Sequence, residues 1–283
     1  MPCHKIRYQG KNMTDNQAFK VALLGIPFDD NSSFERGPAL APSKIREVLN
    51  NGSLNGSTEL GINLRESKLW LDAGNVEITS SDNFIENIEQ RCDELLAQNT
   101  RLVTLGGDHS ISYPILKSYR KYFDKLSILH IDAHSDLYDS FKGNRYSNAC
   151  PFARVMEDGL CDRLVQVGIR TLNLHQTEQI KKFNVESLEM RNWPLSQPLK
   201  FDHPVYLSLD IDGIDPAFAP GVSHREPGGL TTREVINLIH QINMPLVGAD
   251  IVEYNPNKDI DNMTSQLAAK LVKEVAGKML SIS

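Results

Sequence analysis

Cysteine is scarce in this sequence, and the few cysteines that occur stand far apart. They are Cys3, Cys92, Cys150 and Cys161, and no two of them form a Cys-x-x-Cys pair. Disulfide-stapled secreted domains carry a denser set, so this spacing favours a reducing compartment. The first twenty residues are polar and lack the apolar core of a signal peptide. We therefore expect a cytoplasmic protein.

Long apolar runs and an excess of basic residues are also missing. No stretch approaches the roughly twenty apolar residues that a membrane-spanning helix needs. The formal net charge is −6, with 30 Lys and Arg against 36 Asp and Glu. Nucleic-acid-binding proteins usually present a basic face, so we expect neither nucleic acid nor a membrane as partner. An acidic surface is compatible with a small cationic substrate.

Strand patterns and helix patterns alternate along most of the chain. Buried strands are predicted at residues 21–26, 101–105, 127–132, 164–169, 205–210 and 246–249. Helices are predicted near residues 42–49, 84–98, 111–122 and 176–183, after the capping box Thr231-x-x-Glu234, and in the last segment. Residues 50–63 and 137–152 are expected to be loops.

This alternation predicts an α/β fold with a mostly parallel central sheet and helices on both faces, a three-layer sandwich. An α/β domain of this length is often single. We therefore expect an N-terminal arm over residues 1–19 and one domain over residues 20–283.

Carboxylates and imidazoles follow three of the predicted strands. In an open α/β sheet the carboxyl ends of the strands meet at one edge, where sites gather. Ionisable groups at a buried strand end are costly unless something positive pairs with them. A solvated turn with surface carboxylates is the alternative for any one stretch, but three stretches together predict a metal site. The candidate ligands are His109, Asp132, His134, Asp136, Asp210 and Asp212.

Three long motifs occur in a fixed order along the chain. They are Gly106-Gly-Asp-His109, Asp132-Ala-His134-Ser-Asp136 and Ser208-Leu-Asp210-Ile-Asp212-Gly-Ile-Asp-Pro216. Together they resemble the ureohydrolase family, which contains the arginases and agmatinases. The resemblance extends from about Val21 to the last helix. It is strongest to the plant arginases, through residues 31–34, 219–229 and 250–256.

The resemblance implies a site with two Mn²⁺ ions per chain, held by the six candidate ligands, with Asp132 and Asp210 bridging the ions. Oxygen-rich donors of this kind favour Mn²⁺ over zinc. A hydroxide between the ions then attacks the guanidinium carbon and urea is released. Asp108 and Asp215 are expected to support the ligands. The resemblance also implies a homo-oligomer, a trimer or a hexamer.

Three further positions carry the expected catalysis. Glu253 matches the glutamate that holds the guanidinium, although an exposed glutamate after a strand is the alternative. The closest family members have Tyr-Ser-His where this chain has Tyr146-Ser147-Asn148. That histidine is the expected proton shuttle, and asparagine cannot titrate near pH 7. We interpret Asn148 as a substitution, natural or engineered, that impairs an otherwise competent enzyme. His224 is either a substituting acid or a surface-loop histidine.

The substrate stays open between arginine and agmatine. Tyr138, Asp139 and Asn173 stand where many arginases contact the amino-acid head, and by that comparison the pocket resembles agmatinases. Plant arginases share these features and act on arginine.

Three alternatives are kept. One is a hydrolase of another guanidino acid, and another is a protein that binds metal and a guanidino ligand with little turnover. The third, a phosphate-ester hydrolase, would need a basic lining, for which Arg145, Arg154 and Arg225 are too scattered.

Overall fold

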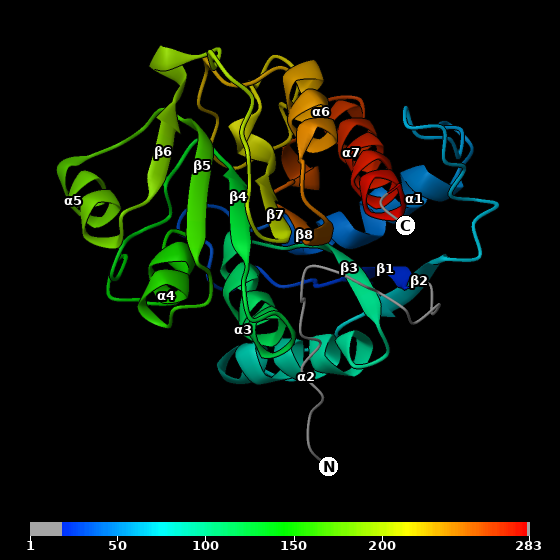
Figure 1. Ribbon diagram of the computed structural model, residues 1–283, viewed down its shortest axis with the longest axis horizontal. Helices are drawn as coiled ribbons and strands as arrows, with labels where there is room; N and C mark the ends of the chain where they lie inside the picture. Colours follow the sequence, from blue (N-terminus) through cyan, green and yellow to red (C-terminus); the bar gives the residue numbers. More distant parts are fainter. Residues whose placement is uncertain (1–18, 282–283) are drawn as a thin grey trace.

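The central feature of the structure, a computed structural model that describes residues 19–281, is one continuous parallel sheet (Figure 1). Its strand order is β2-β1-β3-β8-β7-β4-β5-β6, and every neighbouring pair is parallel. The strands are β1 (Lys20–Gly25), β2 (Trp70–Asn75), β3 (Thr100–Leu105), β4 (Ser127–Ile131), β5 (Arg163–Ile169), β6 (Glu186–Glu189), β7 (Val205–Asp210) and β8 (Leu246–Val252). Residues 1–18 of the expected arm lie outside the described residues.

Helices cover both faces of this sheet, which confirms the predicted three-layer α/β architecture (Figure 1). One face carries α1 (Ala41–Asn50), α6 (Thr232–Gln241) and α7 (Met263–Leu280), and the other carries α2 (Phe84–Leu96), α3 (Ser112–Tyr122), α4 (Pro151–Glu157) and α5 (Leu174–Phe183). Successive strand residues point to opposite faces. Val21 and Leu23 therefore join one hydrophobic cluster, and Ala22 and Leu24 join the other.

Three elements were not predicted. Strands β2 and β6 form the two edges of the sheet and are only partly buried, so neither shows a continuous apolar run. Helix α4 begins at Pro151, and the expectation of a loop through residue 152 was wrong for its last two residues. Pro at the first helical turn needs no backbone N–H donor, which explains the start at Pro151.

The predicted capping box is confirmed: the Thr231 side chain accepts from Glu234 N, and Glu234 accepts from Thr231 N at 2.8 Å.

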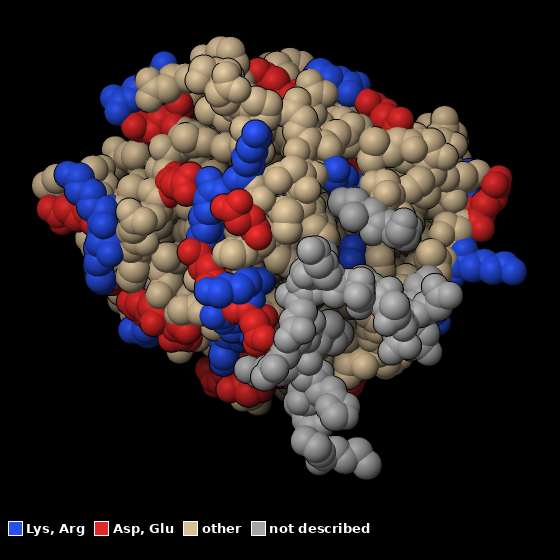
Figure 2. All heavy atoms as spheres, viewed as in Figure 1, with Lys and Arg blue, Asp and Glu red and all other residues tan. Residues whose placement is uncertain are grey.

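The surface is mixed in charge. On the face seen in Figure 2, Lys and Arg side chains are interspersed with Asp and Glu rather than gathered by sign. Of the helices in residues 19–281, none combines the length and the apolar character needed to span a bilayer.

A buried carboxylate joins α7 to its neighbours. Glu274 is fully buried and accepts hydrogen bonds from Lys270 Nζ, from His240 Nε2 at 2.8 Å and from the backbone of Glu59 at 3.1 Å. Burial alone would raise the pKa of Glu274, but these donors outweigh it and lower the pKa below the usual value of 4.5. The charged form of Glu274 therefore stabilises the folded chain.

We predict that Glu274→Gln lowers the free energy of unfolding by about 2 kcal/mol at pH 7, because it leaves buried donors without a charged acceptor. Since the folded-state pKa is the lower one, this contribution is present above the usual value of 4.5 and is lost as the pH falls below it. Urea titrations of both proteins at pH 7 and pH 4 measure it. Glu178→Gln, an exposed position on α5, is the control. Equal stability at pH 7 would contradict the prediction.

Candidate active site

Four adjacent strands end level with one another and deliver the candidate residues to one place. Leu105, Ile251, Leu209 and Ile131 are paired across β3, β8, β7 and β4. Beyond these positions the chain releases His109 after β3, Glu253 after β8, Asp210 at the end of β7, and Asp132 to Asp136 after β4. The carboxyl edge of the sheet therefore holds the site, as sites in open α/β sheets do.

A glycine allows the loop after β3 to reach this edge. A Cβ on Gly107 would lie 1.6 Å from Phe28 O, so no other residue fits between the two backbones. Asp108 then accepts hydrogen bonds from Ser110 N and from Asn31 N, both at 3.0 Å. This turns the imidazole of His109 toward the neighbouring strands.

The buried imidazole of His109 has a defined protonation pattern. Its Nε2 lies 2.9 Å from Ser208 Oγ, and that hydroxyl donates its proton to Asp250 Oδ1 at 2.7 Å. Ser208 must therefore accept from His109, so Nε2 carries a proton. In the neutral ring, Nδ1 then presents a lone pair.

That lone pair faces three carboxylates. Within the described chain, His109 Nδ1 has no hydrogen-bond partner, yet oxygens of Asp132, Asp136 and Asp210 lie 3.2, 3.1 and 3.3 Å away. Burial opposes a charge on His109, but the three carboxylates outweigh it and raise its pKa well above the usual value. Electron-rich atoms this close in a buried place require a cation among them, either a proton or a metal ion.

Asp132 connects this group to a second one. Its Oδ2 faces His109, whereas its Oδ1 lies 3.4 Å from Nδ1 of His134, which is also 3.1 Å from Asp212 Oδ2. The four carboxylates of Asp132, Asp136, Asp210 and Asp212 are all more than nine-tenths buried. Burial, together with Asp212 and Asp132, raises the pKa of Asp210 well above its usual value. Two groups of side chains that could hold a metal ion therefore share Asp132.

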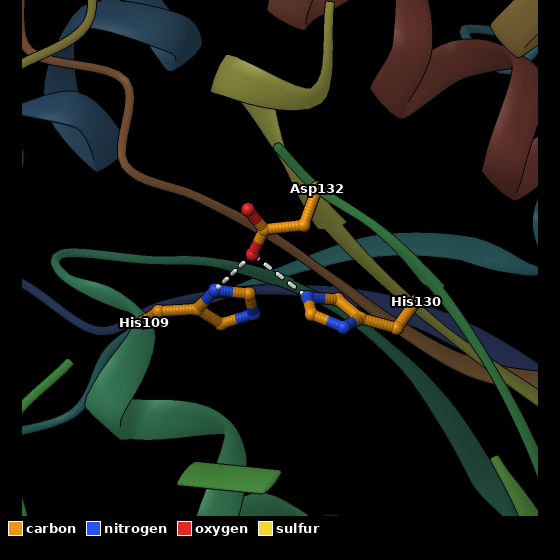
Figure 3. A group of neighbouring side chains, drawn as sticks. All are labelled: His109, His130 and Asp132. Atoms are coloured by element: carbon orange, nitrogen blue, oxygen red, sulfur yellow. Dashed lines mark hydrogen bonds and ion pairs between the residues drawn. The ribbon is translucent and has the colours of Figure 1, made fainter. Parts of the chain in front are cut away.

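His130 is a neighbour of the cluster that the sequence interpretation gave no role. It lies with His109 and Asp132 in a group with the spacing of metal ligands (Figure 3). Gln166 Nε2 donates to Ser135 O at 2.7 Å and lies 3.0 Å from His130 Nδ1, so Nδ1 is an acceptor. The protonated Nε2 then donates to Asp132 Oδ2 at 2.8 Å. Since both ring nitrogens are engaged, His130 orients Asp132.

Glu253 and Asn148 lie in the same pocket as the cluster, a cavity of about 230 Å³. Asn148 Nδ2 donates to Glu253 Oε1 at 2.9 Å, and the backbone N–H of His109 donates to the same oxygen at 2.8 Å. Burial and nearby Asp108 raise the pKa of Glu253 to about 8. Glu253 and Asp136 both have positive φ, 62° and 50°. Such strain is characteristic of functional positions.

The other sequence-predicted residues divide into two groups. Tyr138 and His224 line the pocket, and the His224 ring lies 5.7 Å from the His134 ring. Asp139 and Asn173 do not line it. Asp139 accepts from Gln179 and lies 3.8 Å from Lys182, so its carboxylate faces α5. Asn173 caps that helix by accepting from Gln176 N. Asn173 Nδ2 also donates to the hydroxyl of Tyr138, which lines the pocket, and a substrate role for Asp139 and Asn173 stays a prediction.

Two more residues that hold the site were missed, the partly buried Arg170 and the fully buried Asp250. Arg170 donates to the backbone oxygens of Gly168, Asp212 and Glu226, and so fixes the loops around β5 and β7. Asp250 holds Ser208 from within β8. Asp250 directly follows the predicted strand 246–249 and lies inside the observed β8, so the predicted end of that strand hid its buried polar role. Arg170 gave no signal of its role, because its partners are backbone atoms.

Comparisons with known proteins agree with this geometry. A family model described as the Arginase family matches residues 19–277. Arginase 1, mitochondrial, of Arabidopsis thaliana is 46% identical over 276 residues, which cover 92% of this chain and 81% of that protein. Guanidinobutyrase of Pseudomonas aeruginosa is 36% identical, with 91% and 86% covered. The solved structure of arginase from Medicago truncatula has a TM-score of 0.88 at 42% identity, with 93% and 88% covered.

We predict that Asp132→Ala removes bound divalent metal almost completely, because one carboxylate serves both cation positions. Elemental analysis of protein dialysed against Mn²⁺ measures ions per chain. The control is Asp139→Asn, which changes a carboxylate in the adjoining loop that faces α5 and should leave the metal content unchanged. One tightly held zinc ion per chain, retained by Asp132→Ala, would contradict the assignment.

Proposed function

The chain belongs to the Arginase family, and from that premise we propose that it is a manganese-dependent hydrolase that releases urea from a guanidino substrate. The observation that supports this most is one pocket that joins a carboxylate–imidazole cluster requiring cations to a buried glutamate. The reaction needs a nucleophile, which the metal-loaded cluster would supply, and a group that binds the planar guanidinium, which the glutamate would supply.

We assign two Mn²⁺ ions to the cluster, with His109, Asp132, Asp136 and Asp210 around one and His134, Asp132, Asp210 and Asp212 around the other. The four carboxylates carry −4, and two divalent ions carry +4, so the buried charge is balanced. A donor set dominated by carboxylates favours Mn²⁺ over softer metals. When bound, two such ions lower the pKa of a shared water and so supply a nucleophile near neutral pH.

Glu253 is proposed to hold the guanidinium. Its Oε1 is already fixed by the donors from His109 and Asn148. No donor within residues 19–281 is found for Oε2, which leaves this oxygen for a guanidinium N–H. A charge-assisted hydrogen bond of this kind is short and strong, and it would set the guanidinium carbon beside the metal-binding carboxylates.

We predict that Glu253→Gln weakens substrate binding by about 1.5–3 kcal/mol, the usual worth of a hydrogen bond to a charged group. Metal content should stay the same, since Glu253 is outside the proposed ligand set. Calorimetric titration of the manganese-loaded protein with a guanidino substrate measures the affinity. Unchanged affinity and turnover would remove Glu253 from this role.

Asn148 limits the proposed reaction. Its amide is held between Ser33 N, which donates to Oδ1 at 2.9 Å, and Glu253, which accepts from Nδ2. Asn148 can therefore position Glu253, but it has no proton to give to the departing amine. That amine is too basic to leave as an anion. General acid catalysis contributes typically 10²–10⁴-fold, so slow turnover is expected.

We predict that Asn148→His raises the catalytic rate at least about tenfold and adds a pH dependence near 6.5, the usual pKa of histidine. Urea release from arginine, agmatine and 4-guanidinobutyrate in the presence of Mn²⁺ measures it. Ser140→His places a histidine at an exposed position of the same loop and should give no increase. If Asn148→His gives none either, His224 becomes the candidate acid, and His224→Ala should then abolish the residual rate.

Two alternatives are distinguished by the same assay. Binding of guanidino compounds without any urea would favour a ligand-binding protein. Hydrolysis of phosphate esters is disfavoured, because no Lys or Arg is found among the described residues that line the pocket. The homo-oligomer and the cytoplasmic location stay predictions, and the Arabidopsis relative is named as mitochondrial.

A further inference from the structure

The residues that line the pocket explain how the guanidinium end of a substrate is held, but they do not explain what holds its other end. Asp136, Asp210, Asp212, Glu226 and Glu253 supply carboxylates, whereas the described lining contains no Lys or Arg. A positively charged guanidinium is attracted to such a carboxylate-lined pocket. The proposed ions would balance the aspartates and the guanidinium would balance Glu253, so Glu226 is the lining carboxylate left to repel a substrate whose far end is a carboxylate.

One cation stands near the mouth of the pocket, on a tight turn. Phe141 and Asn144 exchange backbone hydrogen bonds at 3.0 Å, and Lys142 and Gly143 between them have φ of 49° and 83°. Two successive residues with positive φ characterise a type I′ turn, whose first central position favours Asn, Asp or Gly. Lysine is a costly residue at this position. The demands of the turn therefore do not explain why a lysine occupies it.

The turn directs the ammonium of Lys142 toward the pocket. Its Nζ lies 3.3 Å from Ser33 O and 5.5 Å from the centre of the Phe141 ring. Ser33 and Phe141 both line the pocket. No carboxylate within residues 19–281 forms an ion pair with Lys142, so its charge is free to meet a ligand.

The loop that carries Lys142 is held from two sides. Asn144 Nδ2 donates to Asn31 Oδ1 at 3.0 Å. Beneath it, the buried Arg154 donates to the backbone oxygens of Asp139 and Arg145 at 2.7 and 3.0 Å. The backbone on both sides of the turn is thus held by hydrogen bonds.

Glu226 brings the opposite charge to the mouth. It lines the pocket, its side chain is 39% exposed, and its Oε1 lies 3.9 Å from His134 Nε2. An ammonium at the far end of a substrate would find this carboxylate. The two charges come from different loops, so a substrate can engage either one or both.

We propose that Lys142 is a specificity-determining residue that selects guanidino substrates with a carboxylate at the far end and disfavours guanidino amines. The proposal rests on the proposed function, since it takes the guanidinium to be held at Glu253. Arginine would use both Lys142 and Glu226, 4-guanidinobutyrate only Lys142, and agmatine only Glu226.

The test compares kcat/KM for urea release from 4-guanidinobutyrate, arginine and agmatine by the manganese-loaded full chain. Lys142→Met should lower the value for 4-guanidinobutyrate relative to agmatine by roughly threefold to tenfold, the range for a partly exposed charge contact. Lys142→Glu should shift the ratio further, and Lys142→Arg should preserve it. The effect should shrink with added salt, because mobile ions screen an exposed charge.

Lys68→Met is the matched control, since Lys68 is exposed and lies in the segment before β2. Metal content and melting temperature should be the same in all variants. An unchanged substrate ratio in both Lys142→Met and Lys142→Glu would overturn the role of Lys142, while urea release itself would uphold the proposed function.

If no protein releases urea, the proposed function fails and binding decides the inference. Calorimetric titrations of the same variants with 4-guanidinobutyrate and agmatine should then show the same shift in the ratio of dissociation constants. Equal ratios for the parent and Lys142→Glu would overturn the role of Lys142 in that case too.

Discussion

The mutual repulsion of four buried carboxylates is the constraint on which the rest of this structure depends. Parallel strands must end at one edge of the sheet, and here that edge gathers Asp132, Asp136, Asp210 and Asp212 within reach of His109 and His134. Such a cluster is stable only around positive charge. The fold therefore has to hold these groups apart at fixed distances. Chains of buried hydrogen bonds supply that rigidity. Asp250 accepts from Ser208, which contacts His109, and Gln166 contacts His130, which donates to Asp132.

Backbone conformation also helps to place these carboxylates. Glu253 adopts the left-handed conformation, which is unfavourable for glutamate, and Asp136 adopts it too, although aspartate is among the residues that tolerate it. In each case the conformation aims a carboxylate into the pocket immediately after a strand. Arg170 donates to the backbone oxygens of Gly168 and Asp212 and so holds the chain around β5 and β7 in place. Glu253 thus combines an unfavourable backbone conformation with a buried carboxylate.

Much of this was predictable from the sequence because the signals were local. Buried central strands appear as short apolar runs, and residues after them are read off by position, which is how His109, Asp132 and Asp210 could be grouped. Strands β2 and β6 were not predicted because an edge strand has only one neighbouring strand and need not be apolar. Asp139 was expected at the pocket, but its carboxylate accepts from Gln179 of α5, and only the path of the loop decides such an orientation. The supporting roles of His130 and Arg170 depend on contacts across the sheet that no spacing reveals.

One residue couples the chemical end of the pocket to its mouth. The backbone N–H of Ser33 donates to Asn148, which holds Glu253, while the carbonyl of the same residue accepts from Lys142. The loop after β1 therefore contacts both Asn148 and the proposed selectivity residue Lys142. Because both contacts use backbone atoms, changing the Ser33 side chain would leave them in place. The same loop also donates from Asn31 N to Asp108, the residue before His109, so it contacts the proposed metal site as well as the mouth of the pocket.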